Sequence, residues 1–137
     1  MKVRDLMTAE VTTLHRNEML SLAEQLMSLG RVRHLPVVDE DGQLAGIVSQ
    51  RDLFHSGLLR ALGHGKHAAA RVRDMLPVKE VMSTDVITTT PDASLEDAAL
   101  LMVEKKIGCL PVVENGRLVG ILTEGDFVAH FAERKKR

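Results

Sequence analysis

The chain has 137 residues, of which 45% are hydrophobic and 27% are charged, and its formal net charge is −1. This apolar fraction is too high for a disordered chain, and a single cysteine excludes an intramolecular disulfide or a cysteine-rich zinc module. With three Phe and neither Trp nor Tyr, base stacking on aromatic platforms is not expected, and no apolar run reaches the roughly 18 residues of a membrane span. Since the N-terminus also lacks a signal-peptide core, we expect a cytoplasmic protein without a membrane partner.

The chain repeats itself at a fixed spacing. Residues 3–7 return as residues 78–82, and residues 35–38 return as residues 110–113, at an offset of 75. One residue is then lost in a turn, so that Asp52 corresponds to Asp126 at an offset of 74. A register kept over about fifty residues indicates duplication, and two copies are too few for a solenoid. The repeat therefore predicts a closed, pseudo-symmetric pair of small motifs.

Each copy is predicted to begin with an extended segment and a helix. Residues 11–13 and 86–90 are short and β-branched, which favours extended backbone. The helix that follows in each copy has apolar residues at helical spacing: Met19, Leu22, Ala23, Leu26 and Met27 in the first, and Leu95, Ala98, Ala99 and Met102 in the second. Ser94 is a natural cap for the second helix. The first copy has Met19 at that position, so Asn17 is its candidate cap.

A β-hairpin and a last helix complete each copy. The predicted strands are residues 35–38 and 44–48 in the first copy, and 110–113 and 118–122 in the second. Asn115 and Gly116 in the second turn are a strong hairpin signal. The last helices are predicted to begin at Ser49 and Thr123. The expected fold class is therefore α/β, built from two β-α-β-β-α motifs.

The charge pattern distinguishes these motifs from the segments between and after them. Residues 3–53 and 78–127 are acidic on balance, whereas the stretch after each of them is basic. We expect four segments: a first motif at 1–54, a basic helical linker at 55–77, a second motif at 78–131 and a basic tail at 132–137.

Proline and glycine occupy matching places in the two hairpins. Pro36 and Pro111 are expected at the start of their strands, where a missing N–H is tolerated. Gly46 and Gly120 lie inside predicted strands, where glycine normally weakens packing. A β-bulge, or the close approach of another backbone or of a ligand, explains such a glycine equally well.

The sharpest chemical signal is a hydroxyl followed three residues later by a carboxylate, which occurs twice. Ser49 precedes Asp52, and Thr123 precedes Asp126, each at the start of a predicted helix. Such a pair can act as a capping box that satisfies the first N–H groups of the helix. It can also serve as a site, in which the carboxylate accepts hydrogen bonds from a ribose diol and the helix N-terminus faces an anion.

These motifs, in this order and spacing, resemble a tandem pair of cystathionine-β-synthase (CBS) domains. The resemblance rests on Leu-Pro-Val-Val, an acidic turn with glycine, a Gly-Ile strand and Ser/Thr-x-x-Asp, and it covers residues 3–53 and 78–130. It implies two motifs packed sheet to sheet with pseudo-two-fold symmetry, with two clefts between them. It also implies a regulatory or sensor module without catalytic residues, whose ligands contain adenosine: AMP, ADP, ATP or S-adenosylmethionine.

By the same resemblance, each cleft combines halves of the two copies. The first cleft would be formed by Ile47, Ser49, Arg51, Asp52, Val86, Ile87, Ile107, Cys109 and Pro111. The second would be formed by Val11, Thr12, Val32, His34, Pro36, Ile121, Thr123 and Asp126. The apolar members also suit ordinary core positions. Arg51 of the first copy corresponds to Gly125, and His34 corresponds to Cys109, so equal affinity in the two clefts is not expected.

Other polar residues favour plain structural interpretations. His34 is expected to be part of a cleft wall, and Cys109 a small buried apolar residue. His64 and His67 lack further ligands for a metal, and we predict none. The basic tail, residues 134–137, is expected to be solvated. No nucleophile–base set is apparent, so an enzyme is not expected.

The sequence therefore predicts a sensor of adenine nucleotides that has no cofactor and regulates an unknown protein partner. Apolar side chains at the helix rims, including Phe127, Val128 and Phe131, predict a homodimer. Two alternatives stay open: a structural dimerisation module with empty clefts, and a regulator that binds nucleic acid through the basic stretches.

Overall fold

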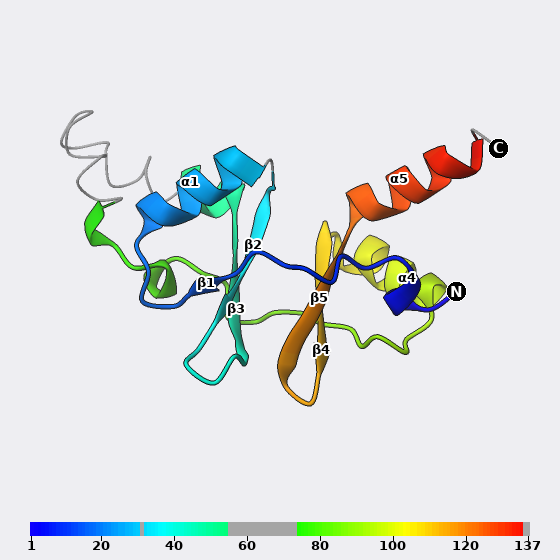
Figure 1. Ribbon diagram of the computed structural model, residues 1–137, viewed down its shortest axis with the longest axis horizontal. Coiled ribbons are helices and arrows are strands. Elements are labelled where there is room, and N and C mark those ends of the chain that lie inside the picture. Colours follow the sequence, from blue (N-terminus) through cyan, green and yellow to red (C-terminus); the bar gives the residue numbers. More distant parts are fainter. Residues whose placement is uncertain (31, 55–73, 136–137) are drawn as a thin grey trace. The chain divides into compact units, whose positions relative to one another are not determined.

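The computed structural model describes residues 1–30, 32–54 and 74–135 (Figure 1). Most of the predicted linker, residues 55–73, lies outside the described residues, as does the end of the predicted tail, residues 136–137. The chain forms two compact units: unit 1 comprises Met1–Val11 and Ile87–Arg137, and unit 2 comprises Thr12–Val86. The units and the sequence repeat therefore have different boundaries, because the first eleven residues belong with the second copy.

Unit 2 is a three-stranded sheet with helices. Its strands are β1 (Leu14–His15), β2 (His34–Val38) and β3 (Leu44–Ser49), in the order β1-β2-β3. β1 pairs with β2 in parallel, and β2 pairs with β3 antiparallel. The helices are α1 (Leu20–Gly30), a helical stretch at residues 50–54 and a 3-10 turn, η2 (Val78–Glu80).

Unit 1 repeats this plan with one strand fewer. β4 (Cys109–Glu114) and β5 (Arg117–Thr123) form an antiparallel hairpin. The helices are α4 (Leu95–Lys105), α5 (Glu124–Lys135) and a 3-10 turn, η1 (Val3–Asp5). A single parallel bridge between Thr89 and Val112 takes the place of β1. The α/β class is confirmed, and the order of elements agrees with the prediction except that this bridge stands in place of the first strand of the second copy.

Each unit has its own apolar core, formed where the predicted helix stripe meets the inward face of its hairpin. The core of unit 2 contains Leu14, Leu20, Ala23, Met27, Leu35, Val37, Val48 and Val78. The core of unit 1 contains Val3, Leu95, Ala98, Met102, Leu110, Val112 and Leu122. Both cores include one residue from a 3-10 turn, Val78 or Val3, which is fully buried. The helical stripe read from the sequence is therefore the buried face.

Two local predictions need correction. Strand pairing near the predicted extended segments occurs at Leu14 and His15, directly after residues 11–13, and at Thr89, within residues 86–90. Pro36 and Pro111 are the third residues of their strands. At the start of α1, the Leu20 N–H donates to the Leu76 carbonyl at 2.9 Å. A backbone carbonyl therefore satisfies an N–H group of the first helical turn, for which Asn17 was the predicted cap.

The cap predicted for the other helix is present. Ser94 accepts a hydrogen bond from the Asp97 N–H at 3.0 Å. The left-handed Lys106 ends this helix, with its N–H on the carbonyls of Met102 and Val103.

The segment that begins each copy of the repeat packs on the sheet of the other copy. In unit 1, Thr8 and Ile121 exchange two backbone hydrogen bonds of 2.9 and 3.0 Å. In unit 2, Ser83 and Ile47 exchange two of 2.9 and 3.0 Å. The Val3 N–H likewise donates to the Ala93 carbonyl. Residues 1–8 thus complete unit 1, and residues 76–83 complete unit 2, by the same contacts.

This packing explains the strand glycines. A Cβ at Gly46 would lie 2.7 Å from the Ser83 carbonyl oxygen, and one at Gly120 would lie 3.0 Å from that of Thr8. Both glycines also stand next to a shift in the strand register. Close approach of a backbone and an adjacent bulge, two of the predicted explanations, are therefore both present.

Candidate functional site

The Ser49–Asp52 pair forms a complete capping box where β3 becomes a helix. The Ser49 N–H donates to Oδ2 of Asp52 at 2.8 Å, and the Asp52 N–H donates to the Ser49 hydroxyl oxygen at 3.0 Å. Both residues are half-buried. The two bonds fix the carboxylate by one of its oxygens, so Oδ1 remains for a further donor.

The Thr123–Asp126 pair forms the same box at the start of α5. The Thr123 N–H donates to Oδ2 of Asp126 at 2.9 Å, and the Asp126 N–H donates to the Thr123 hydroxyl oxygen at 3.3 Å. The Thr123 hydroxyl is in turn 3.2 Å from Oδ2. The capping function, one of the two interpretations of this motif, is thus present in both copies. It leaves the ligand function open, because each box uses only one carboxylate oxygen.

A residue that the sequence did not single out contacts the second box. The Thr8 hydroxyl donates to Oδ1 of Asp126 at 3.4 Å. The two residues are far apart in sequence, and Thr8 reaches α5 because its backbone pairs with Ile121 of β5. The available signal was the repeat itself, which places a hydroxyl residue at this position in both copies, Thr8 and Ser83.

Strand register groups the predicted site residues within each unit. His34 stands opposite Ser49, and Pro36 opposite Ile47. In unit 1, Cys109 stands opposite Thr123, and Pro111 opposite Ile121. Unit 2 also contains Thr12, Val32, Arg51, Asp52 and Val86, and unit 1 also contains Val11, Ile87, Ile107 and Asp126. The crosswise combination of these residues stays a prediction.

The two matching strand positions differ in chemistry. His34 is half-buried. Cys109 is buried, and burial, followed by the nearby Glu124 carboxylate, raises the pKa of its thiol to about 12. The thiol is therefore protonated at neutral pH, and Cys109 acts as the small apolar residue that was predicted.

The first turns of the two helices differ in charge. Arg51 and Gln50 follow Ser49, whereas Glu124 and Gly125 follow Thr123. All four residues are exposed. A guanidinium at a helix N-terminus attracts anions, and a carboxylate at the same place repels them.

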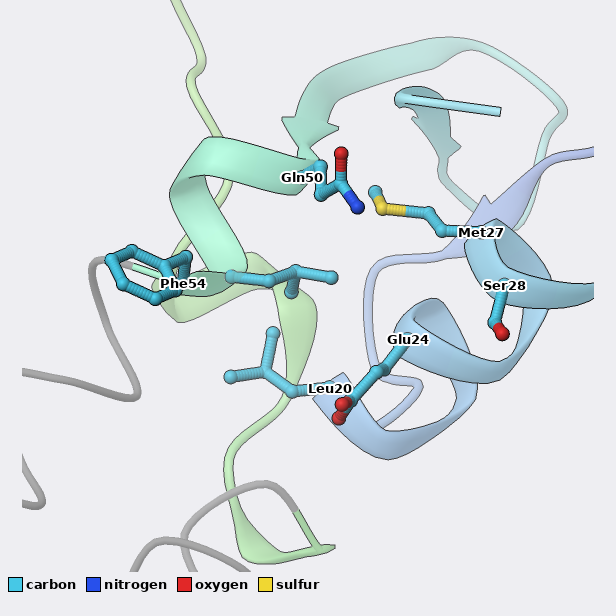
Figure 2. A pocket seen from close by; sticks show the side chains of 7 residues that line it. Leu20, Glu24, Met27, Ser28, Gln50 and Phe54 are labelled. Atoms are coloured by element: carbon cyan, nitrogen blue, oxygen red, sulfur yellow. The ribbon is translucent and has the colours of Figure 1, made fainter. Parts of the chain in front are cut away.

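A separate hollow of about 350 Å³ lies between α1 and the helical stretch at residues 50–54 (Figure 2). Its lining residues are Leu20, Glu24, Met27, Ser28, Gln50, Leu53 and Phe54. None of these residues belongs to the predicted clefts. The hollow therefore lies on the helical side of unit 2, and its residues Gln50 and Leu53 flank the predicted site residues Ser49, Arg51 and Asp52 in the sequence.

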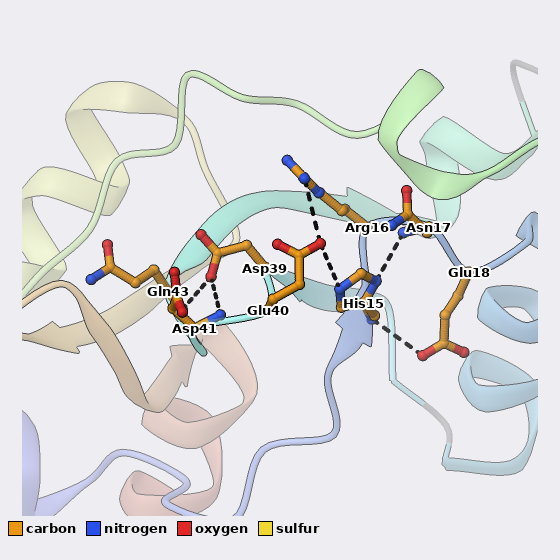
Figure 3. A network of polar contacts seen from close by, with 8 residues as sticks. All are labelled: His15, Arg16, Asn17, Glu18, Asp39, Glu40, Asp41 and Gln43. Carbon is orange, nitrogen blue, oxygen red and sulfur yellow. Dashed lines mark hydrogen bonds and ion pairs between the residues drawn. The ribbon is translucent and has the colours of Figure 1, made fainter.

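A polar network surrounds the turn between β2 and β3 (Figure 3). Glu40 Oε1 lies 3.5 Å from His15 Nε2 and 3.4 Å from an Arg16 guanidinium nitrogen. The Asp39 carboxylate accepts the N–H groups of Asp41 and Gln43, which closes the turn. Within residues 1–30, 32–54 and 74–135, no three His, Cys, Asp or Glu residues are grouped to hold a metal ion. The helices in the same part of the chain include none long and apolar enough to cross a membrane.

The chain matches the family model of the CBS domain twice, over residues 3–58 and 78–133. These two stretches include the repeated residues 3–53 and 78–130 and extend a few residues beyond them.

Three solved structures are similar over almost their whole length. A putative acetoin utilization protein (AcuB) from Vibrio cholerae is 40% identical, with a TM-score of 0.85, and the match covers 99% of this chain and 93% of that one. CBSX2 in complex with AMP is 30% identical, with a TM-score of 0.77 and coverage of 99% and 98%. The CBS domain pair of protein MJ0100, in complex with 5'-methylthioadenosine and S-adenosyl-L-methionine, is 28% identical, with a TM-score of 0.77 and coverage of 98% of both chains.

Proposed function

Because the chain belongs to the CBS domain family, we propose that it is a regulatory module that binds adenosine-containing nucleotides. The observation that carries this proposal is the repeated capping box, Ser49 with Asp52 and Thr123 with Asp126, directly after a strand in each unit. The AMP, 5'-methylthioadenosine and S-adenosylmethionine complexes of similar CBS pairs support adenosine as the shared part of the ligand.

The box suits a nucleotide because it combines a hydrogen-bond acceptor, the carboxylate, with hydrogen-bond donors, the N–H groups of the first helical turn. The carboxylate oxygen outside the cap accepts hydrogen bonds from ribose hydroxyls, and a charged acceptor makes such bonds strong. The N–H groups of the first helical turn offer donors and a positive dipole end to a phosphate. We propose that Ser49 and Asp52 serve one ligand, and that Thr123 and Asp126 serve another.

Each site would be completed by residues of the other copy, as the family resemblance implies. In this proposal, Val86, Ile87, Ile107, Cys109 and Pro111 complete the Asp52 site. Val11, Thr12, Val32, His34 and Pro36 complete the Asp126 site. Backbone groups of the extended segments would then meet the adenine edge, and the apolar side chains would enclose the ring.

Ligand binding would regulate by a shift of populations. A nucleotide that contacts both copies stabilises the arrangement in which both contacts exist, to the extent that its affinity for that arrangement is higher. The proposed output is a change in the surface offered to a regulated protein, and the module itself needs no catalytic residue. We place this function in the cytoplasm, where AMP, ADP and ATP are available.

A structural role in dimerisation is the second candidate, and it has its own support. Four large apolar side chains on α4 and α5 are more than half exposed: Leu100, Val103, Val128 and Phe131. Such exposed side chains need cover, and an isologous contact with a second copy would supply it. We propose a homodimer in either case. The two candidates differ in whether nucleotides bind at all.

Thermal unfolding with and without nucleotide separates the two candidates. A ligand that binds only the native protein raises the melting temperature, and at a hundred times its Kd the gain is about 2.7 kcal/mol. We expect AMP or ATP to raise the melting temperature, and mass spectrometry of the purified protein to detect a bound adenosine compound. If AMP, ADP, ATP and S-adenosylmethionine at millimolar concentration all leave the melting temperature unchanged, the sensor function is wrong and the structural role is the one that stands.

A further inference from the structure

The two leading segments, residues 1–8 and 76–83, carry a methionine at the same position of the repeat, Met7 and Met82. Both side chains are half-buried, and they pack against the cores of units 1 and 2, respectively. At the residue after each methionine, two backbone hydrogen bonds join the leading segment to its strand. The two thioethers therefore lie where a leading segment meets the sheet.

Each of these methionines lies against a strand glycine. A Cβ at Gly46 would lie 2.7 Å from the Met82 sulfur, and one at Gly120 would lie 2.7 Å from the Met7 sulfur. Non-bonded heavy atoms stay about 3.5–4.0 Å apart, so the sulfur occupies the space that a side chain at the glycine would need. The space between sulfur and glycine therefore does not admit one further atom.

The thioethers are also the sulfur groups that an oxidant can use. Cys109 is the only cysteine of the chain, and its buried thiol is protonated at neutral pH, whereas thiol oxidation needs the thiolate. A thioether has no proton to lose, so its reaction with a peroxide depends on access to the sulfur. Half-buried side chains give that access.

We propose that Met7 and Met82 are modification sites, at which a peroxide oxidises the thioether to the sulfoxide and so loosens the leading segment. The sulfur attacks one oxygen of hydrogen peroxide, and the S–O bond forms as the O–O bond breaks. The sulfur loses two electrons, and the leaving hydroxide takes the proton of the new S–OH group to give water. The added oxygen either collides with the glycine or turns the polar side chain toward water, so the methionine–glycine contact is lost in both cases. This modification is independent of the proposed nucleotide binding.

Peptide mapping of the parent protein after timed exposure to hydrogen peroxide measures the oxidation of each methionine. Met75, which is 76% exposed, is the reference for an unhindered thioether, and Met27, which is 5% exposed, is the reference for a protected one. We expect Met7 and Met82 to react more slowly than Met75 and faster than Met27, while the protein is still folded.

Hydrogen exchange of two backbone amides then measures whether the segments loosen. The Thr8 N–H donates to the Ile121 carbonyl, and the Ser83 N–H donates to the Ile47 carbonyl, both at 2.9 Å. We expect oxidation to accelerate the exchange of both amides about tenfold, because the opening of each segment becomes easier. Reduction by methionine sulfoxide reductases should restore the original exchange rates.

Two variants distinguish this effect from general oxidative damage. Met7→Leu combined with Met82→Leu keeps apolar side chains of similar volume without a thioether, so peroxide should leave the exchange of Thr8 and Ser83 unchanged. Met75→Leu should respond to peroxide as the parent does. The proposal is wrong if Met7 and Met82 stay unoxidised while Met75 reacts, or if their sulfoxides leave both amides as protected as before. These two outcomes are measured on the parent protein, so they hold even if the double variant is unstable. Equal acceleration in the double variant would also overturn the proposal, since another group would then be responsible.

Discussion

Units 1 and 2 have nearly the same backbone contacts and different side-chain contacts. In both, a leading segment pairs with the glycine-bearing strand, through Thr8 with Ile121 or through Ser83 with Ile47. In unit 1, Asp92 binds the leading segment through Arg4 and Lys2. Lys79 and Asn17 occupy the positions of Arg4 and Asp92 in unit 2, so that ion pair has no counterpart there.

Unit 2 has instead a network at its β-turn, in which Glu40 meets His15 and Arg16 (Figure 3). The difference shows which contacts the fold requires. Backbone pairing and the buried 3-10 residues, Val3 and Val78, are present in both units. Among the residues that the structure describes, each of these ion pairs is present in one unit and not in the other, as expected for contacts that contribute little to stability.

The largest effect on stability is expected from substitutions of Gly46 and Gly120, the strand glycines that lie against the backbone of a leading segment. A Cβ at Gly46 would lie 2.7 Å from the Ser83 carbonyl oxygen and 2.7 Å from Met82 Sδ, so the leading segment must move. We expect Gly46→Ala to lower the free energy of unfolding by about 2–3 kcal/mol, and Gly120→Ala, with 3.0 Å to the Thr8 oxygen, by about 1 kcal/mol. Urea denaturation measures both values.

Gly125→Ala is the matched control for these two variants. A Cβ there meets only the Thr123 hydroxyl oxygen, at 3.5 Å, and alanine favours a helix by about 0.8–1 kcal/mol over glycine. This variant should be as stable as the parent or more so. Equal urea midpoints for Gly46→Ala and the parent would mean that the leading segment does not need this close contact.

The second comparison concerns binding at the two boxes. Asp52→Ala should weaken binding at one site by about ten- to a hundredfold and leave the Asp126 site working, and Asp126→Ala should do the reverse, because each removes a charged acceptor for ribose. Calorimetry counts the sites that remain. Asp52→Asn and Asp126→Asn keep an acceptor for the cap, so they separate lost binding from a loosened helix start. Parent-like titrations of both alanine variants would restrict these residues to capping.

The proposed sites should also differ in their response to phosphate. Arg51 offers a guanidinium where unit 1 has Gly125, so we expect Arg51→Ala to weaken ATP about tenfold at the Asp52 site and AMP less. Gly125→Arg should tighten ATP at the Asp126 site. Both are measured by titration with ATP and AMP in parallel. If Arg51→Ala leaves the affinity for both nucleotides unchanged, Arg51 is a solvated helix residue.

The smallest expected effect is a difference in pH dependence. A side-chain hydrogen bond and the charge of Arg4 lower the pKa of Asp92, and a backbone hydrogen bond, Arg16 and His15 lower the pKa of Glu40. A carboxyl with a lowered pKa stabilises the native state above its unfolded value of about 4, and this contribution is lost as the pH falls through the folded value. We therefore expect the melting temperature to fall slightly less between pH 7 and pH 2 in Asp92→Asn and in Glu40→Gln than in the parent protein. If the melting temperature of both variants changes with pH as it does in the parent, neither ion pair contributes to stability.

The sequence was sufficient for the elements that local chemistry determines. Apolar spacing predicted α1 and α4, and Asn115 with Gly116 predicted the β4–β5 turn, where both residues have positive φ. The hydroxyl–carboxylate spacing predicted the capping boxes. These features depend on neighbours within about four residues, so the pattern and the structure agree.

Contacts distant in sequence were not predictable in the same way. Nothing local to residues 1–8 indicates that they complete the unit formed by the second copy, and the Leu76 carbonyl at the start of α1 is equally remote. Gly46 and Gly120 gave a partial signal, since they indicated a close approach without identifying the segment. Thr8 was missed because its hydroxyl meets Asp126 only through that pairing.

The exchange of leading segments bears on how a chain of this kind arises. One copy of the repeat supplies residues 1–8 to the other and receives residues 76–83 in return. A chain with a single copy would complete its core by the same contacts only as a pair of identical chains, each giving its first residues to the other. Joining two such chains end to end yields the present molecule. In a chain with both copies, a substitution changes one unit without changing the other, and the two copies do differ at paired positions such as Thr8 and Ser83 or Arg51 and Gly125.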